Sequence, residues 1–478
     1  MPVRIAFDIP HTPVGGGRIR AGMCALCITV LLALAGCATM PPPPLGNDTP
    51  AVWQNAPADM NAPAPDLRGW WKAFNDPALD RLVDAALAAN LTVAQAGYRV
   101  AAARRLADHR NDEFLPQLGA HTFAEPVPDS SASYFQAGFD AKWEFGLFGR
   151  VQARSNLVYG ELGMTEADAQ AARVSVVAEV ARAYMELRGA QQRLALLQQL
   201  AAGADEKVNL MQTRLRLRLG SANDLARAQV EQAAAQAALV DPQLAMVSSQ
   251  WKLAVLLGKT EPDASLVEAG ELPDLGELRV ASVPADLLRT RPEIRRAEAE
   301  VLKAAGALGL ARAELYPRIG FGGSLTYSAR VIGHTRLADA DGIVTLGPVI
   351  DIPLFDWGMR RATADARDAE LSAALLAYRQ AVIEGIAEAE DAMATLEHQR
   401  DRIAVLDRGL AGVEQGEATF DTLHALGLAD GLDGVSATAA LAQARIEVAQ
   451  AEQARNLAFI ALYKALGGAP LPSQQAAD

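Results

Sequence analysis

The sequence contains few aromatic residues and has no cysteine after position 37. Phe, Trp and Tyr make up only 5% of its 478 residues, although 50% of the residues are hydrophobic. Alanine supplies much of that hydrophobic content, and an Ala-rich chain with few aromatics is typical of long helices packed closely together. A compact enzyme of this length would be expected to carry a larger aromatic core, so the composition disfavours that class.

The sequence also lacks the residue sets that ordinarily carry catalysis or bind metals. It has no nucleophile elbow, no phosphate-binding loop and no cysteine–histidine set. Glu388, Glu390 and Asp391 are expected to form a solvated helix face rather than a pair of catalytic carboxylates. None of the six histidines is paired at metal-ligand spacing: His11, His109, His121, His334, His398 and His424. We therefore predict no enzymatic activity, no cofactor and no metal site.

Long apolar runs and positive net charge are absent as well. Beyond residue 36, no stretch approaches the roughly 18 apolar residues of a membrane-spanning helix. The formal net charge is −13, which argues against a nucleic-acid partner.

The three cysteines gather near the amino terminus, at Cys24, Cys27 and Cys37. Basic residues precede an apolar stretch at 21–34, which runs into Leu34-Ala35-Gly36-Cys37. This pattern resembles a bacterial lipoprotein signal, in which cleavage leaves an amino-terminal cysteine that accepts acyl chains. It predicts a signal peptide at 1–36 and lipidation of Cys37. The alternative is an ordinary secretory signal with an incidental cysteine.

A proline-rich segment at 37–69 follows the signal and predicts an extended tether. The folded body begins after it, with Asp76 as a helix cap and Pro77 as the first helical residue. Helical spacing of apolar residues continues to about Phe114, and Pro116 ends the helix.

The stretch from Tyr134 to Phe145 alternates between apolar and mostly polar residues. A period of two places successive side chains on opposite faces of a β-strand, so one face lies in an apolar medium and the other in water. The pattern alone fits a half-buried strand of a soluble sandwich, or a transmembrane barrel strand of about 9–11 residues. In the second setting the lipid-facing residues are Phe135, Phe139, Trp143 and Phe145.

Long helical patterns fill most of the remaining chain. Between Gly149 and Pro242 there is no proline, and apolar residues recur every seven positions from Val180 to Leu215, as in a coiled coil. A helix over about 149–219 would be roughly 100 Å long.

Each long pattern ends in a turn before a second helix returns. In the first turn Gly220 is expected to end one helix, and Ser221 or Asn223 to cap the next. That returning helix is expected to reach Leu257, with a kink at Pro242. A Gly-rich break at 427–434 forms the corresponding turn in the second half.

The second half of the chain repeats the order of the first. Leu147 and Leu354, Pro116 and Pro317, and Leu257 and Leu466 lie 207, 201 and 209 residues apart, which indicates an internal duplication. The expected segments are a signal peptide at 1–36, a tether at 37–69, a first structural repeat at 70–258, a connector at 259–291, a second structural repeat at 292–468 and a tail at 469–478.

The predicted fold is mainly α with a small β part, because each repeat supplies long coiled-coil helices and only two strands. The resulting four strands cannot close a barrel, which needs about eight, and open sheet edges are not tolerated in lipid. If the strands are transmembrane, the chain must therefore oligomerise. Three copies would supply twelve strands, and the paired helices could close into a tube alongside them.

Several motifs together resemble the outer membrane factor family, the TolC-like efflux channels, and in particular its NodT-type lipoproteins. The resemblance covers nearly all of the mature chain. The motifs are Trp70-Trp71-x-x-Phe74-x-Asp76-Pro77, Trp143-Glu144-x5-Arg150, Pro284-Ala285-Asp286-Leu287-Leu288-x-x-Arg291-Pro292-Glu293-Ile294, Pro353-Leu354-Phe355-x-x-Gly358 and Leu462-Tyr463-Lys464-Ala465-Leu466-Gly467-Gly468.

The resemblance implies a homotrimer with a twelve-stranded β-barrel in the outer membrane, continued by a periplasmic α-barrel. It implies docking to a periplasmic adaptor protein and an inner-membrane pump, and passive conduction of small molecules to the exterior. Asp430 and Asp433 would form the periplasmic gate, although a solvated acidic turn is the alternative. The adaptor-contact tips would be Leu219, Gly220, Ser221, Asn223, Asp224, Gly427 and Leu428.

Two other functions remain as rivals on the sequence alone. One is a structural or adhesive envelope lipoprotein that uses its coiled coils as a spacer, and the weaker one is a periplasmic enzyme. A spacer has no need of a lipid-facing row of aromatic residues on a strand, so the alternating stretch favours the channel.

Overall fold

The computed structural model describes residues 43–45, 53, 67–125, 133–275, 290–332 and 336–471. Cys37 and the signal peptide lie outside these ranges, as does most of the tether. The chain divides into two compact units. We call them, for the described residues alone, the sheet unit (within His109–Val158 and Leu302–Leu371) and the helical unit (within Pro44–Asp108, Tyr159–Val301 and Ser372–Asp478). No helix in the described ranges is both long and apolar enough to cross a membrane.

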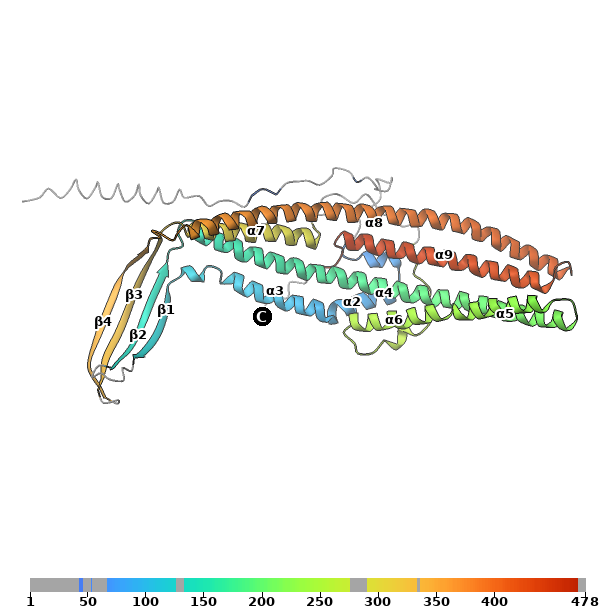
Figure 1. Ribbon diagram of the computed structural model, residues 1–478, viewed down its shortest axis with the longest axis horizontal. Coiled ribbons are helices and arrows are strands. Elements are labelled where there is room, and N and C mark those ends of the chain that lie inside the picture. The colour runs from blue at the N-terminus through green and yellow to red at the C-terminus, as the bar shows by residue number, and fades with distance from the viewer. Residues whose placement is uncertain are drawn as a thin grey trace, which may run out of the picture. The chain divides into compact units, whose positions relative to one another are not determined.

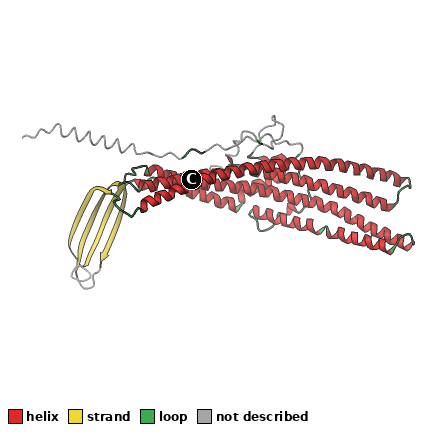
Figure 2. Cartoon of the chain, turned by 45° about the horizontal axis from the view of Figure 1, so that its top comes forward, coloured by secondary structure: helices red, strands yellow, loops and turns green. Residues whose placement is uncertain are grey.

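The sheet unit contains four antiparallel strands (Figures 1 and 2). They are β1 (Gln117–Glu125), β2 (Ser133–Glu144), β3 (Arg318–Ile332) and β4 (Arg336–Asp351), in the order β1-β2-β3-β4. The central pair joins the two repeats, since Phe139 of β2 lies opposite Leu325 of β3. The prediction of four strands is confirmed, and within one chain β1 and β4 each have an unpaired edge.

Helices make up most of the rest of the described chain (Figure 1). Two of them, α4 and α8, are each 67 residues long, which corresponds to roughly 100 Å. In chain order the helices are η1 (Trp70–Phe74), α2 (Pro77–Ala89), α3 (Leu91–Asp108), η2 (Asp112–Phe114), α4 (Arg150–Arg216), α5 (Ala222–Ala237), α6 (Val240–Leu256), η3 (Ala264–Leu266), α7 (Pro292–Ala313), α8 (Met359–Ala425) and α9 (Gly431–Ala465).

Two predicted helices are interrupted in the structure. Asn90 separates α2 from α3, because its side-chain oxygen accepts hydrogen bonds from the amides of Thr92 and Val93 and so caps α3. The returning helix of the first repeat breaks into α5 and α6 at Ala238–Leu239. That break lies three residues before Pro242, which has no amide hydrogen to donate. The predicted single helix ending near Phe114 was therefore wrong, and the predicted kink appears as a break.

The duplication is visible in the backbone as well as in the order of elements. Four positions with a left-handed backbone recur 209 residues later: Phe148 and Trp357, Gly149 and Gly358, Arg218 and Gly427, and Gly258 and Gly467. Left-handed residues mark sharp changes of chain direction. The two repeats therefore turn at equivalent points.

An aromatic cluster joins the two ends of the folded body in the helical unit. Phe459 of α9 is 1% exposed and contacts the rings of Trp70, Phe74 and Tyr463. The indole nitrogen of Trp70 donates a hydrogen bond to the carbonyl of Gly468 at 3.1 Å. The predicted cap is confirmed beside it, since Asp76 accepts from the amides of Ala78 and Leu79.

The beginning of the connector is held against α4 by buried polar groups. Arg188 donates to the side-chain oxygen of Gln191 and to the carbonyl of Glu268, at 2.8 and 2.9 Å. Gln191 in turn donates to the same carbonyl at 3.1 Å. These bonds satisfy charged and amide groups that would be costly to bury alone.

Tyr184 gives the helical unit a specific alkaline sensitivity. Its hydroxyl is buried and donates to Asp76 at 2.6 Å, and burial followed by that bond raises its pKa from 10.0 to about 12. The unfolded chain therefore releases this proton first, so we expect stability to fall as pH rises from about 10 to about 12. In Tyr184→Phe, the part of this loss of stability that comes from ionisation of Tyr184 should disappear. Thermal midpoints of the two proteins, measured across this range, would contradict the assignment if they fell in parallel.

Candidate functional site

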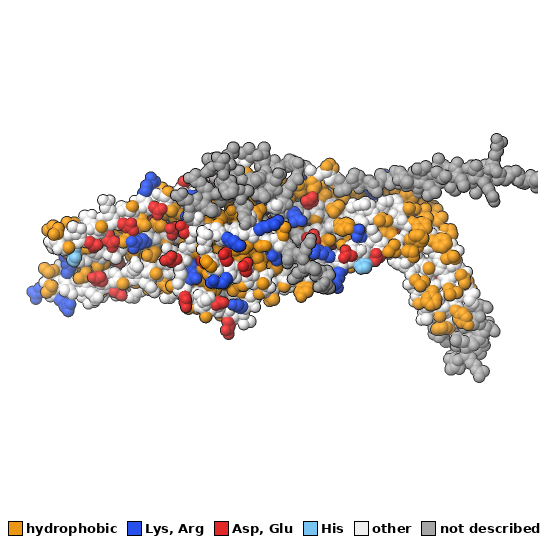
Figure 3. Space-filling model, turned by 180° about the vertical axis from the view of Figure 1, so that it is seen from behind, with side chains coloured by type: hydrophobic (Ala, Val, Ile, Leu, Met, Phe, Trp, Pro, Cys, Tyr) orange, Lys and Arg blue, Asp and Glu red, His pale blue; other side chains and the backbone are white. Residues whose placement is uncertain are grey.

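One face of the sheet is lined with exposed apolar side chains. Phe135, Phe139 and Trp143 recur at every fourth residue of β2, so their side chains share this face. Phe139 lies beside Leu325 of β3, and Leu346 of β4 belongs to the same face; these three side chains are 53%, 48% and 74% exposed. Figure 3 shows the hydrophobic side chains gathered over the strands. An apolar surface spread over several strands marks contact with lipid or with another protein.

Aromatic residues also gather at one end of the sheet. Phe145 lies one residue beyond β2, and its amide donates to the carbonyl of Ile319. Its ring meets Trp143 edge-on at 4.8 Å, and the Trp143 indole donates to the carbonyl of Phe114 at 3.0 Å. Amphipathic rings of this kind are enriched where a membrane meets water. All four predicted lipid-facing residues thus lie on or beside one strand.

The opposite face of the sheet is mostly polar, and its polar groups pair with one another across the strands. His121 of β1 and Asp140 of β2 form an ion pair with 2.8 Å between nitrogen and oxygen. Gly138 leaves room for the imidazole, since a Cβ atom there would lie 3.2 Å from the ring. Ser324 and Thr345 are hydrogen-bonded at 2.7 Å farther across the sheet. One apolar face and one polar face fit a wall between lipid and an aqueous lumen.

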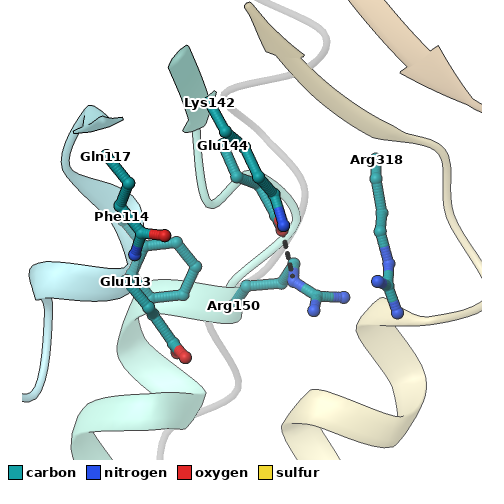
Figure 4. A pocket seen from close by; sticks show the side chains of 7 residues that line it. All are labelled: Glu113, Phe114, Gln117, Lys142, Glu144, Arg150 and Arg318. Atoms are coloured by element: carbon teal, nitrogen blue, oxygen red, sulfur yellow. Dashed lines mark ion pairs between the residues drawn. The ribbon is translucent and has the colours of Figure 1, made fainter. Parts of the chain in front are cut away.

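A polar cavity of about 330 Å³ lies where the strands meet the first turn of α4 (Figure 4). Within it Arg150 pairs with Glu144 at 3.0 Å, and these side chains are only 15% and 23% exposed. The predicted motif Trp143-Glu144-x5-Arg150 contains both residues, but the motif alone does not show that they pair. The lining residues are Glu113, Phe114, Gln117, Lys142, Glu144, Arg150 and Arg318. Because Glu144 ends β2 and Arg150 begins α4, their ion pair braces the turn from strand to helix.

The predicted contact tips lie in two turns of the helical unit. We call the turn between α4 and α5 the first tip and the turn between α8 and α9 the second tip. Both begin their returning helix with a reciprocal cap. In the first, Ser221 accepts from the amide of Asp224, and Asp224 accepts from the amide of Ser221. A hydrogen bond from the Ser221 hydroxyl, followed by the one from the Ser221 amide, lowers the pKa of Asp224. The reciprocal bonds hold this tip in one backbone conformation.

The second tip uses the two predicted gate residues as caps. Asp430 accepts from the amides of Leu432 and Asp433, and Asp433 accepts from the amide of Asp430. The other carboxylate oxygen of Asp430 lies 3.4 Å from the guanidinium of Arg214 on α4. The structure thus links the two tips through Arg214, a residue that no sequence pattern singles out.

The residue that ends α4 differs from the prediction. Arg218, not Gly220, has the left-handed backbone, with φ of 60°, and Gly427 holds the equivalent place with φ of 71°. The amide of Leu219 donates to the carbonyl of Arg214, as that of Leu428 does to Leu423. A side chain in this conformation costs free energy that glycine avoids.

We predict that Arg218→Gly will stabilise the first tip by roughly 1 kcal/mol, because a left-handed residue with a side chain costs about 1–2 kcal/mol and the greater chain entropy of glycine offsets part of that gain. Hydrogen exchange of the amides in 215–222 should slow, because the native turn no longer strains a side chain. The matched change at the second tip, Gly427→Ala, should instead speed exchange there. Equal exchange in the first tip before and after Arg218→Gly would show that the turn carries no strain.

The described ranges contain no cluster of three or more His, Cys, Asp or Glu side chains that could hold a metal ion. The site therefore consists of a two-faced wall in the sheet unit and two capped tips in the helical unit.

Comparison with known proteins gives a consistent result. A sequence profile of the outer membrane efflux proteins matches residues 82–259 and again residues 283–468. The pyoverdine export outer membrane protein OpmQ of Pseudomonas putida is 28% identical over 93% of this chain and 97% of its own. Nodulation protein T of Rhizobium leguminosarum bv. trifolii is 25% identical over 93% and 97%. The solved outer-membrane channel OprN matches with a TM-score of 0.77 at 27% identity, over 90% of this chain and 99% of its own.

Proposed function

We propose how the parts of this chain, which belongs to the outer membrane efflux protein family, act in transport. The protein is an outer-membrane exit channel of a tripartite efflux system and extends into the periplasm. Its fold is mainly α, and its working form is a trimer with a β-barrel continued by an α-barrel. The sheet unit forms the wall of the channel in the membrane, and the helical unit meets the partners and carries the gate.

The observation that carries the proposal is the two-faced sheet with two open edges. Its apolar face meets the lipid of the outer membrane, and its polar face lines the lumen. Strand edges left open in lipid would be costly, so β1 of one protomer pairs with β4 of the next, and twelve strands close the barrel. A coiled-coil spacer would leave this apolar face without a role.

The lumenal wall is suited to passive conduction. Small residues such as Gly138, Ser324 and Thr345 occupy much of the polar face, and small side chains leave the lumen wide. The selection of cargo therefore falls to an inner-membrane pump and a periplasmic adaptor, which dock to the helical unit. Cys37 carries acyl chains that add a lipid anchor beside the barrel.

Asp430 and Asp433 form the periplasmic gate in this proposal, together with Arg214. The tips close around the pore in the trimer, where three copies of the Asp430–Arg214 pair restrain the two hairpins of each protomer. Opening of the channel requires that these pairs separate. An adaptor that engages the tips can supply the free energy for this separation.

Engineered disulfides test the barrel directly, because the sequence has no cysteine after Cys37. Leu118→Cys on β1 would be combined in turn with Val344→Cys, Leu346→Cys or Ile350→Cys on β4. At least one pair should yield a covalent trimer on non-reducing gels from outer membranes. Each single cysteine serves as the control. Covalent dimers without trimers, or no cross-links from any pair, would contradict closure between β1 and β4.

A further inference from the structure

The polar cavity at the end of the strands lies on the polar face of the sheet. Lys142 and Glu144 alternate with Trp143 along β2, so their side chains lie on the face opposite to the Trp143 indole. Gln117 of β1 lies opposite Lys142 in the register and shares its face. In the proposed channel this cavity therefore belongs to the lumenal wall, where solutes pass, and not to the lipid-facing surface.

Positive charge exceeds negative charge in the lining of this cavity. Three basic and two acidic side chains give it a net charge of +1 (three minus two): Lys142, Arg150, Arg318, Glu113 and Glu144. Both carboxylates are already engaged, since Glu113 pairs with Arg154 at 3.1 Å and Glu144 with Arg150 at 3.0 Å. Lys142 forms no ion pair with any residue that the structure describes. The lining thus holds a positive charge that no carboxylate of the described chain balances.

Arg150 adds a buried hydrogen-bond donor that is not used within the protein. Its side chain is only 15% exposed, and among the described residues its Nη1 atom has no acceptor. A buried charged donor without an acceptor is costly. Figure 4 shows the Arg150 side chain extended toward the guanidinium of Arg318, a like charge. An anionic group between these two side chains would accept from the free donor and reduce their repulsion.

The size and composition of the cavity suit a small organic anion. Its volume of about 330 Å³ is at the lower end of the roughly 300–1,000 Å³ of small-molecule sites. Guanidinium groups bind carboxylates and phosphates through paired, charge-assisted hydrogen bonds. Phe114 supplies the one aromatic ring among the described lining residues, and this ring can contact the apolar part of such a molecule.

We propose that this cavity is a subsite for the carboxylate or phosphate group of small organic anions that pass through the channel. Arg150 and Arg318 hold the oxygens of that group, Lys142 supplies the unbalanced positive charge, and Phe114 contacts the apolar part. The inference rests on the proposed function, because it takes the polar face as the lumenal wall, and it adds a class of solute that this wall binds. Conduction requires that such binding be weak enough for release.

Binding of benzoate and of its neutral analogue benzamide to the full-length trimer in phosphatidylcholine nanodiscs tests the proposal. Titrations followed by saturation-transfer NMR should show benzoate bound about tenfold more tightly, with an affinity that falls as salt rises. Lys142→Gln combined with Arg318→Gln leaves the Glu144–Arg150 pair intact and should abolish this preference. Arg361→Gln combined with Arg367→Gln removes the same charge from exposed positions on α8 and should preserve it.

A variant that strengthens binding separates loss of the subsite from damage to the fold. Glu113→Gln removes a carboxylate from the lining and should raise the affinity for benzoate about threefold, because one repulsive charge is lost. Its affinity for benzamide should not change. A benzoate affinity that falls in Glu113→Gln trimers would contradict the electrostatic account of the cavity.

Two further results would overturn the proposal. One is equal binding of benzoate and benzamide to the wild-type trimer. The other is displacement of benzoate by phosphatidylglycerol in the nanodisc but not by dissolved glycerol 3-phosphate, which would assign the cavity to lipid headgroups. Conductance in planar bilayers separates this inference from the channel itself. A trimer that conducts but binds both probes equally contradicts the subsite alone, whereas a trimer that does not conduct contradicts the proposed function.

Discussion

Replacement of Phe139 by arginine should prevent the chain from assembling as an outer-membrane trimer. Phe139 lies near the middle of β2 on the apolar face, opposite Leu325, and is 53% exposed in the single chain. An arginine facing lipid near the middle of a barrel costs about 2–4 kcal/mol, and every protomer of a trimer would incur that cost. The trimer band on SDS gels of unheated samples should disappear, and the chain should no longer be found in the outer-membrane fraction.

A matched change on the other face of β2 separates this effect from damage to the strand. Gln136 lies on the polar face, so Gln136→Arg places the same side chain in the aqueous lumen. Its trimer should assemble at nearly the wild-type level. If both arginines were tolerated equally, or if Gln136→Arg were the more harmful, the assignment of the two faces would be wrong.

Phe459→Ala should destabilise the helical unit by about 3–5 kcal/mol, the usual cost of removing a buried phenyl ring. Phe459 is 1% exposed and lies 5.4 Å from the ring of Phe74 and 4.6 Å from that of Tyr463. Its loss also weakens the packing of the segment Trp70–Phe74 against α9. The midpoint of urea unfolding, followed by the helical circular dichroism signal, should fall sharply.

The control for this change is Leu219→Ala at the first tip, where the side chain is 70% exposed. A substitution at such a surface position is usually within about 0.5 kcal/mol of neutral. Limited proteolysis should cut near residue 70 in Phe459→Ala but not in Leu219→Ala. Similar unfolding midpoints for the two variants would show that the aromatic cluster does not hold the two ends together.

The sequence predicts the periodic parts of this protein well. Alternation from Tyr134 to Phe145 predicts β2, because a period of two has few other physical explanations. The proline-free run after Gly149 predicts a helix over about 149–219, and α4 spans Arg150–Arg216. Recurrent landmarks about 200 residues apart predict the repeat that the backbone then shows.

Features that depend on single side chains could not be predicted in the same way. Asn90 ends α2 because its amide reaches the backbone of α3 and also donates to the carbonyl of Leu256, a contact between distant residues. The sequence does not indicate the left-handed conformation of Arg218, because Gly220 follows two positions later and glycine is the more usual residue in that conformation. Pairing of Arg214 with Asp430 depends on how two hairpins pack.

The repeats have diverged most clearly at their tips. Equivalent helix caps are present at Ser221 and Asp430, so the two tips begin their returning helices with the same capping motif. The exposed charges differ in sign, because the capping geometry fixes only a few side chains and leaves the others free to change. A common architecture can therefore carry different surface charges in one duplicated chain.

The most direct test of the channel is the conductance of the purified trimer in planar lipid bilayers, compared with the variant Asp430→Asn combined with Asp433→Asn. Asparagine is also a good helix cap, so the variant removes charge while retaining the local fold. We expect a low conductance from the wild type and a larger one from the variant, since its Arg214 no longer faces a carboxylate. Absence of conductance from both proteins, reconstituted as intact trimers, would contradict the assignment of this chain as an exit channel.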